Sequence, residues 1–218
     1  MGAFRTLLVI HITAGAIALT SAFVAAATKT LDLPHKWHIY SGVTFFIGMI
    51  VIFVTAIPMA FMKSNVFLFL IAIFSFYLAL SGWRYARNRS GAPARFDWVI
   101  AGLMAVASVC MIFFGVMIFT GDHSHGITMA IFGCIGAGLS FSDLWGFRRG
   151  GVSGKQRIAN HSTKMLAGTI ATVTAFLVTN FTTHPAFILW LAPTVVITPF
   201  IVWWGKRIQA GVKPKGMP

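Results

Sequence analysis

Seven histidines and four acidic residues are the side chains of this sequence that could bind a metal ion or transfer a proton. His11, His38 and His161 lie in or at the start of long apolar runs, and Asp143 lies inside another such run. A polar group at membrane depth is unfavourable unless it is paired, and such groups usually mark functional sites. These four residues are therefore the first candidates for chemistry.

The polar groups associated with the apolar runs fall at two heights if each run is a helix that crosses a membrane. The inner level holds His35, His38, Arg84, Asp97, Asp143 and His161. The outer level holds His11, Asp122, His123, His125, Asn180 and His184. Each level is thus a separate candidate site.

Histidines at one height on two helices are the pattern that a b-type haem requires, because its iron takes one imidazole from each side. His38 and His161 begin two apolar runs at the inner level and predict such a pair. His11 would belong to an outer site, with a loop histidine as its partner. The two levels would be about 20 Å apart by helix rise, a spacing suited to electron transfer across the membrane.

Other functions are compatible with the same residues. His38, His161 and Asp143 could hold zinc with an open position, as an intramembrane hydrolase requires, although no two histidines in the chain have the His-x-x-x-His spacing. His11, Asp143 and His161 could instead relay protons in a proton-coupled transporter or channel. A structural or assembly role stays open as well, and no reaction is assigned.

Several of these groups also have a structural explanation. Arg84 can pair with an Asp or extend to the lipid headgroups, and Asp97 can cap the helix that it begins. Asp143 can form an ion pair with Arg84 or Arg148. A neighbouring Thr or carbonyl group can satisfy His11.

The composition indicates a membrane protein. Of the 218 residues only 10% are charged and 57% are hydrophobic, and the mean hydropathy is +0.83. A soluble domain has about 25% charged residues, so most soluble folds are excluded. The net charge of +13 could suggest a nucleic-acid partner, but the basic residues lie between apolar runs and form no single soluble face. We therefore expect the lipid bilayer as partner, and no nucleic acid.

Seven segments are long and apolar enough to cross a bilayer as helices. The predicted spans are Phe4–Thr28, His38–Met62, Val66–Ala86, Asp97–Thr120, Ile127–Phe147, His161–Phe181 and Ala186–Gly205. The first has a longer apolar run than a signal peptide and is expected to be a retained helix. With short connections throughout, the prediction is an all-α polytopic membrane bundle that forms a single domain over residues 1–218.

The basic residues are distributed unevenly between the two sides of this bundle. All of the 17 Lys and Arg residues except Arg5 and Lys63 fall on one side, and Lys164, Lys213 and Lys215 are counted there. Cytoplasmic loops carry the excess of basic residues. With seven spans, the N-terminus is predicted outside and the C-terminus in the cytoplasm, in a bacterial cytoplasmic (inner) membrane.

Short motifs along most of the chain are similar to those of one family. The matching stretches are His11–Gly15, His38–Gly42, Phe67–Arg84 with its end Leu80–Arg84, the Asp97 that begins the fourth span, His161–Met165, Ala171–Asn180 and Trp190–Pro193. In them the sequence resembles the bacterial membrane proteins catalogued as domain of unknown function 2306. The resemblance implies a multi-pass helical membrane protein without an assigned activity, and it picks out His11, His38, Arg84, Asp97, Asp143, His161 and Asn180. A looser similarity, His-x-x-x-Gly at helix starts, is to cytochrome b membrane reductases. Whether the protein is a homo-oligomer or a subunit of a membrane complex stays open.

Overall fold

The computed structural model describes residues 2–211, which leaves Lys213 and Lys215 outside the described residues. Residues 2–211 form helices without any strand: α1 (Gly2–Thr30), α2 (His35–Met62), α3 (Val66–Arg87), α4 (Arg95–Ile118), α5 (His123–Arg148), α6 (Gly154–Asn180) and α7 (Phe187–Ala210). Each of the seven is long and apolar enough to cross a membrane. The prediction of an all-α bundle with seven such helices is confirmed for this part of the chain.

The helix ends differ from the predicted spans, because hydropathy detects the apolar run and not the helix that contains it. α6 begins at Gly154, so His161 lies about two turns inside the helix and not at its start. α5 begins at His123, where the carboxylate of Asp122 accepts a hydrogen bond from the amide of His125 at 3.0 Å. Polar first turns like these are invisible to a search for apolar residues.

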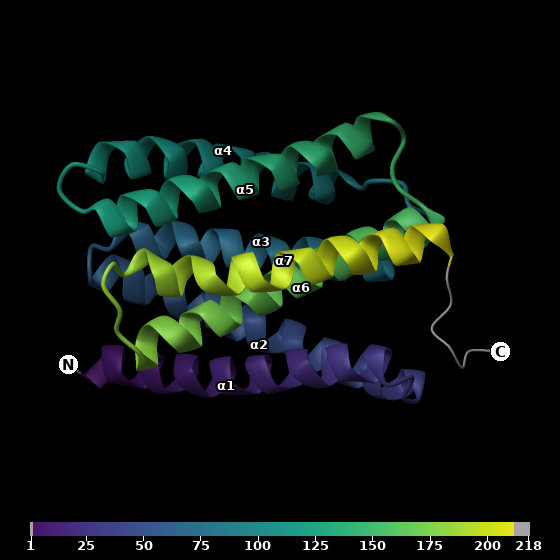
Figure 1. Ribbon diagram of the computed structural model, residues 1–218, viewed down its shortest axis with the longest axis horizontal. Coiled ribbons are helices and arrows are strands. Elements are labelled where there is room, and N and C mark those ends of the chain that lie inside the picture. Colours follow the sequence, from purple (N-terminus) through teal and green to yellow (C-terminus); the bar gives the residue numbers. More distant parts are fainter. Residues whose placement is uncertain (1, 212–218) are drawn as a thin grey trace.

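The helices form three groups (Figure 1). α1 packs along α2 at one side, α4 packs along α5 at the other, and α3, α6 and α7 lie between them. We call α4 and α5 the hairpin, and the other five helices the body. Among the described residues, α1 contacts only α2 and α6. Within residues 2–211 the backbone of the hairpin comes close to the body at α3 and α7, and Lys164 of α6 reaches α5 with its side chain.

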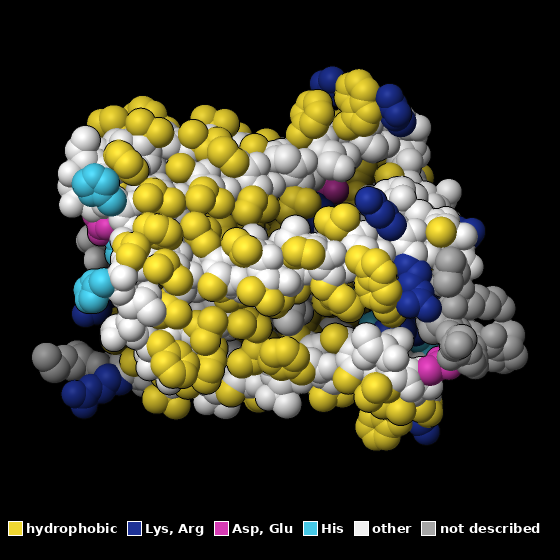
Figure 2. All heavy atoms as spheres, in the orientation of Figure 1, with side chains coloured by type: hydrophobic (Ala, Val, Ile, Leu, Met, Phe, Trp, Pro, Cys, Tyr) yellow, Lys and Arg dark blue, Asp and Glu magenta, His cyan; other side chains and the backbone are white. Residues whose placement is uncertain are grey.

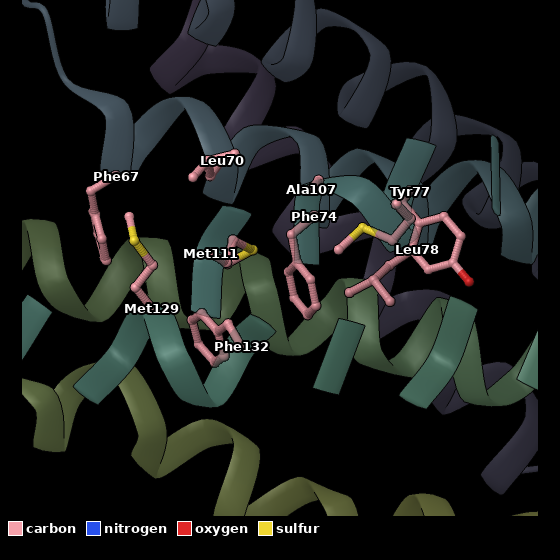
Figure 3. Close-up of a cluster of buried hydrophobic side chains, with 10 residues drawn as sticks. Phe67, Leu70, Phe74, Tyr77, Leu78, Ala107, Met111, Met129 and Phe132 are labelled. Atoms are coloured by element: carbon pink, nitrogen blue, oxygen red, sulfur yellow. The ribbon is translucent and has the colours of Figure 1, made fainter. Parts of the chain in front are cut away.

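An apolar cluster fills most of the boundary between the hairpin and the body (Figure 3). Phe67, Phe74 and Leu78 of α3 meet Met111 of α4 and Phe132 of α5 there, with Phe74 and Phe132 stacked 5.5 Å apart. The hydroxyl group of Tyr77 points away from these side chains, as Figure 3 shows. The apolar part of the boundary therefore ends at Tyr77.

The charged side chains gather at one end of the bundle. Figure 2 shows Lys and Arg at the end where α7 finishes, and histidines at the opposite end. The described chain starts and finishes at opposite ends, as Figure 1 shows. We call the end rich in Lys and Arg the inner end, and the other the outer end.

Candidate functional site

His38 and His161 lie side by side at the inner end. Their ring centroids are 6.3 Å apart and their planes are nearly perpendicular, at 89°. Both side chains are half-buried. A single ion between two imidazoles holds their centroids roughly 6 Å apart, because each metal–nitrogen bond is about 2 Å long. The separation therefore fits two ligands of one metal centre.

Hydrogen bonds to backbone carbonyl groups determine which ring nitrogen of His38 and of His161 carries a proton. Nδ1 of His38 lies 3.0 Å from the carbonyl oxygen of Ala25, and Nδ1 of His161 lies 2.9 Å from that of Gly82. A carbonyl oxygen only accepts, so each Nδ1 must carry the proton and donate it. In a neutral ring this leaves the lone pair on Nε2. Metal-bound histidines are commonly oriented in this way.

Gly82 allows α3 and α6 to approach closely at this site. A Cβ atom at residue 82 would lie 2.9 Å from Sδ of Met165 and 3.1 Å from Cβ of Lys164. Any larger residue would thus press directly on α6. The absence of a side chain at residue 82 lets the carbonyl of Gly82 reach His161.

A buried ion pair that the sequence did not predict joins α5 to α6. Nζ of Lys164 lies 2.7 Å from Oδ2 of Asp143, and the two side chains are only 4% and 3% exposed. The hydroxyl of Tyr77 donates to Oδ2 of Asp143 at 2.6 Å, and that of Tyr85 donates to Oδ1 at 2.9 Å. Asp143 was expected to pair with Arg84 or Arg148. That expectation is wrong, because Lys164 occupies the carboxylate.

Lys164 was missed because it was counted with the inner loops. It lies on α6 one turn after His161, and α6 starts well before the apolar run. The i, i+3 spacing puts both residues near one face of the helix, which is the signal that could have identified it. Tyr77 and Tyr85 resemble ordinary core aromatics in the sequence, and only the position of Asp143 shows their role.

A second ion pair joins α3 to α4. Nε and Nη2 of Arg84 donate to Oδ1 and Oδ2 of Asp97 at 2.6 and 2.8 Å. Oδ2 of Asp97 also accepts from the amide of Ala94 at 2.8 Å, in the first turn of α4. Two expectations therefore hold together, since Asp97 caps its helix and Arg84 pairs with an Asp.

Both ion pairs cross from the hairpin to the body at the inner end. The acids, Asp97 and Asp143, belong to the hairpin, and the bases, Arg84 and Lys164, belong to the body. A cavity of about 30 Å³ between them is lined by Tyr77, Ser81, Arg84, Tyr85, Asn88, Gly91, Pro93, Asp97, Ile100, Ala101, Asp143, Phe147 and Val152. Asp143 of one pair thus lines the same cavity as both members of the other.

His11 has a local partner. Its Nδ1 lies 2.9 Å from Oγ1 of Thr55 on α2, while the hydroxyl of Thr55 donates to the carbonyl oxygen of Val51 at 2.7 Å. Because that hydroxyl proton is used, Nδ1 of His11 must donate to Thr55. One of the two expectations for His11, satisfaction by a neighbouring Thr, is confirmed. No ring contact joins His11 to another histidine within residues 2–211.

The remaining outer groups are spread over different helices. His125 packs against Phe67 and Trp190, with ring centroids 4.7 and 6.5 Å away. Asn180 ends α6 and donates to the carbonyl oxygen of Phe176 at 2.8 Å, and His184 is exposed. Within residues 2–211 none of these residues is hydrogen-bonded to His11, whose side-chain partner is Thr55.

Asp122, in the outer loop before α5, makes a local pair with His125. Its carboxylate accepts from the amide of His125 at 3.0 Å and lies 2.6 Å from Nδ1 of the same residue. The amide hydrogen bond, followed by the contact with the ring, lowers the pKa of Asp122 below its ordinary value. Asp122 is thereby used as a helix cap.

No cluster of three or more His, Cys, Asp or Glu side chains placed to hold a metal ion occurs within residues 2–211. The inner histidine pair therefore stands apart from the two ion pairs. Searches of protein-family models, of curated proteins and of solved structures found no match to this chain.

Proposed function

We propose that this chain is a membrane electron-transfer protein that binds one b-type haem between His38 and His161. The observation that carries the proposal is the pair of imidazoles 6.3 Å apart, each with Nδ1 held on a backbone carbonyl. Two imidazoles complete the coordination of haem iron, because the macrocycle supplies the other four nitrogens. The donor set that is present therefore matches what haem needs from a protein.

The space next to His38 also suits a flat macrocycle. Gly42 lies one turn after His38 on the same helical face, and apart from the adjoining backbone of α2 no atom lies within 4 Å of where its Cβ would be. Gly42 leaves room beside His38, and His38 and His161 would hold the haem. When bound, it would supply one-electron redox chemistry, while the chain orients the two ligand rings through Ala25 and Gly82.

The position and contacts of the Asp143 carboxylate favour haem over zinc. As a third zinc ligand Asp143 would have to lie beside His38 and His161, but no such cluster of three donors occurs within residues 2–211, and the carboxylate is paired with Lys164. Two histidines alone leave zinc two ligands short of its usual four. The donor set therefore favours haem over the zinc site of a hydrolase.

The proposal places the site at the cytoplasmic side of a bacterial inner membrane. The gathering of Lys and Arg at the end that carries His38 and His161 supports this orientation, with the N-terminus outside. Membership of the family catalogued as domain of unknown function 2306 is part of the proposal and rests on the motifs around the same residues. With a single haem, donor and acceptor come from partners, so we expect a subunit of a membrane complex.

The test is the absorbance of protein purified after expression with ample haem, recorded in air and after dithionite. We expect a Soret band and, on reduction, an α band, both lost in His38→Ala and in His161→Ala. His35→Ala is the matched control, because His35 stacks on His38 at 6.1 Å but its Nδ1 faces Lys29. A colourless wild-type protein, or equal loss in His35→Ala, would refute the proposal.

A further inference from the structure

The Asp143–Lys164 pair is embedded in the interior of the bundle, where charges are strongly disfavoured. The Asp and Lys side chains are 3% and 4% exposed. Replacing a buried ion pair with apolar residues is often neutral or even stabilising, so packing alone does not explain such a pair. Ionisable groups inside a membrane protein that are not needed for packing commonly handle protons or ions.

The hydrogen bonds around the pair are complete in its charged form. The ammonium group of Lys164 donates to Oδ2 of Asp143 at 2.7 Å, to Oη of Tyr77 at 2.6 Å and to the carbonyl oxygen of Leu139 at 3.4 Å. The carboxylate also accepts from Tyr77 and Tyr85. All three ammonium protons and both carboxylate oxygens are thus in use, which makes the ion pair the resting state.

The cavity connects Asp143 to the loops at the inner end. Its wall includes Asp143 and Tyr85 on one side, and Asn88, Gly91 and Val152 of the loops on the other. The amide of Val152 donates to the carbonyl oxygen of Gly91 at 3.0 Å, so the two loops meet over it. A volume of about 30 Å³ holds roughly two water molecules. Figure 2 shows acidic side-chain atoms in the hollow between hairpin and body, near the inner end.

We infer that Asp143 is a proton-exchange site, which takes up and releases protons through water in this cavity. A hydronium ion in the cavity gives its proton to Oδ1 of Asp143, which forms an O–H bond and leaves a water molecule. Lys164 keeps its ammonium charge and loses its ionic partner. The reverse step returns the proton to the cavity, and no electrons change hands. The site does not depend on haem binding.

The charges that face Asp143 come from all the helices around it. Lys164 of α6 and the hydroxyl groups of Tyr77 and Tyr85 of α3 bind it directly, and Arg84 of α3 and Asp97 of α4 line the same cavity; Arg157 and His161 of α6 are the other titratable side chains near this end and are bonded to carbonyl oxygens of α3. Arg84 and Asp97 neutralise each other at 2.6 Å. The guanidinium of Arg157 is held by the carbonyl oxygens of Tyr85 and Ala86. Lys164 is therefore the charge that responds directly when Asp143 is protonated.

Infrared difference spectra of the full-length protein in lipid nanodiscs, recorded during a pH titration, test the inference. The chain has only four acidic side chains, so few carboxyl bands need to be assigned. We expect a protonated-carboxyl band that grows on acidification and is absent in Asp143→Asn. Tyr85→Phe removes one hydrogen bond that stabilises the carboxylate. In that variant the Asp143 band should therefore reach half of its full intensity at a pH about one unit higher than in wild type, which is a tenfold change in proton affinity.

The route is tested separately by filling the cavity. Ala101 is 1% exposed and lines it, so Ala101→Leu should slow the deuterium shift of the Asp143 band after mixing with D₂O. Ala107→Leu is the matched control, because Ala107 is equally small and buried on α4 but lies in the apolar cluster. A band that persists in Asp143→Asn, or exchange as fast in Ala101→Leu as in wild type, would overturn the inference. A protein without haem that passes both tests would refute only the proposed function.

Discussion

The boundary between the hairpin and the body is built in two different ways along its length. From the outer end to the middle it is apolar, with Phe67 and Phe74 of the body against Met111 and Phe132 of the hairpin. At the inner end it consists of two ion pairs and their tyrosine partners. One surface thus changes from close packing to charge pairing at Tyr77.

The apolar part and the ion pairs hold the hairpin against the body in different ways. Inside a bilayer apolar helices gain little from leaving lipid, so the apolar part is held by close packing alone. Apolar contact is not directional, so it leaves freedom in how the two surfaces are aligned. The charges remove that freedom, because both acids lie on the hairpin and both bases on the body. We infer that packing supplies contact area and the ion pairs set the register.

The largest effect is expected from Lys164→Met, which leaves the carboxylate of Asp143 buried without a counter-ion. Removing one partner of a buried pair costs about 3–5 kcal/mol. Unfolding of the purified protein in mixed detergent micelles measures this loss. The double variant Lys164→Met/Asp143→Leu should recover most of it, and a double variant as unstable as the single one would show that the pair has no special role.

A somewhat smaller loss is expected when the apolar part is opened by Phe132→Ala. Phe132 is 6% exposed and stacks on Phe74, and truncating a buried Phe costs about 3 kcal/mol. The same unfolding assay should show a loss that does not change with pH. A loss that varies with pH would show that the apolar part and the ion pairs are coupled and do not act separately.

Arg84→Gln should have a moderate effect. The Arg84 side chain is 32% exposed, whereas that of Asp97 is 8% exposed, so water partly replaces the lost hydrogen bonds. We expect a loss of about 1 kcal/mol, clearly below that of Lys164→Met. Equal losses in the two variants would mean that depth in the bundle does not distinguish the two pairs.

The smallest effect is expected at the outer end, from Asp122→Ala. Loss of the helix cap should cost about 0.5 kcal/mol, the low end of the range for an exposed cap. Because the pKa of Asp122 is lowered on folding, its contribution is present above its unfolded pKa, near 4, and disappears as the pH falls through the folded value. Stability curves of both proteins should therefore converge at acidic pH. Curves that stay parallel would exclude this role.

The sequence predicts the helices well and the site only in part. Seven apolar runs suffice for seven helices, and matching heights suffice to bring His38 and His161 together. The pairing of Arg84 with Asp97 can be predicted as well, because only a short stretch of chain separates the two residues. The buried position of Lys164 cannot be predicted, because it depends on α6 beginning at Gly154. The polar first turns of that helix carry no apolar signal. The partners of Asp143 come from two other helices, and nothing in the local sequence specifies which helices meet.

The positions of the four charges along the chain also set the order of assembly. Arg84 precedes Asp97, so this pair can form as soon as α4 enters the membrane beside α3. Asp143 of α5 is synthesised before Lys164 of α6 and has no counter-ion until α6 arrives. During biogenesis its carboxyl group must stay neutral or in contact with water. Insertion of α6 is therefore the step that completes the inner end and fixes the hairpin in place.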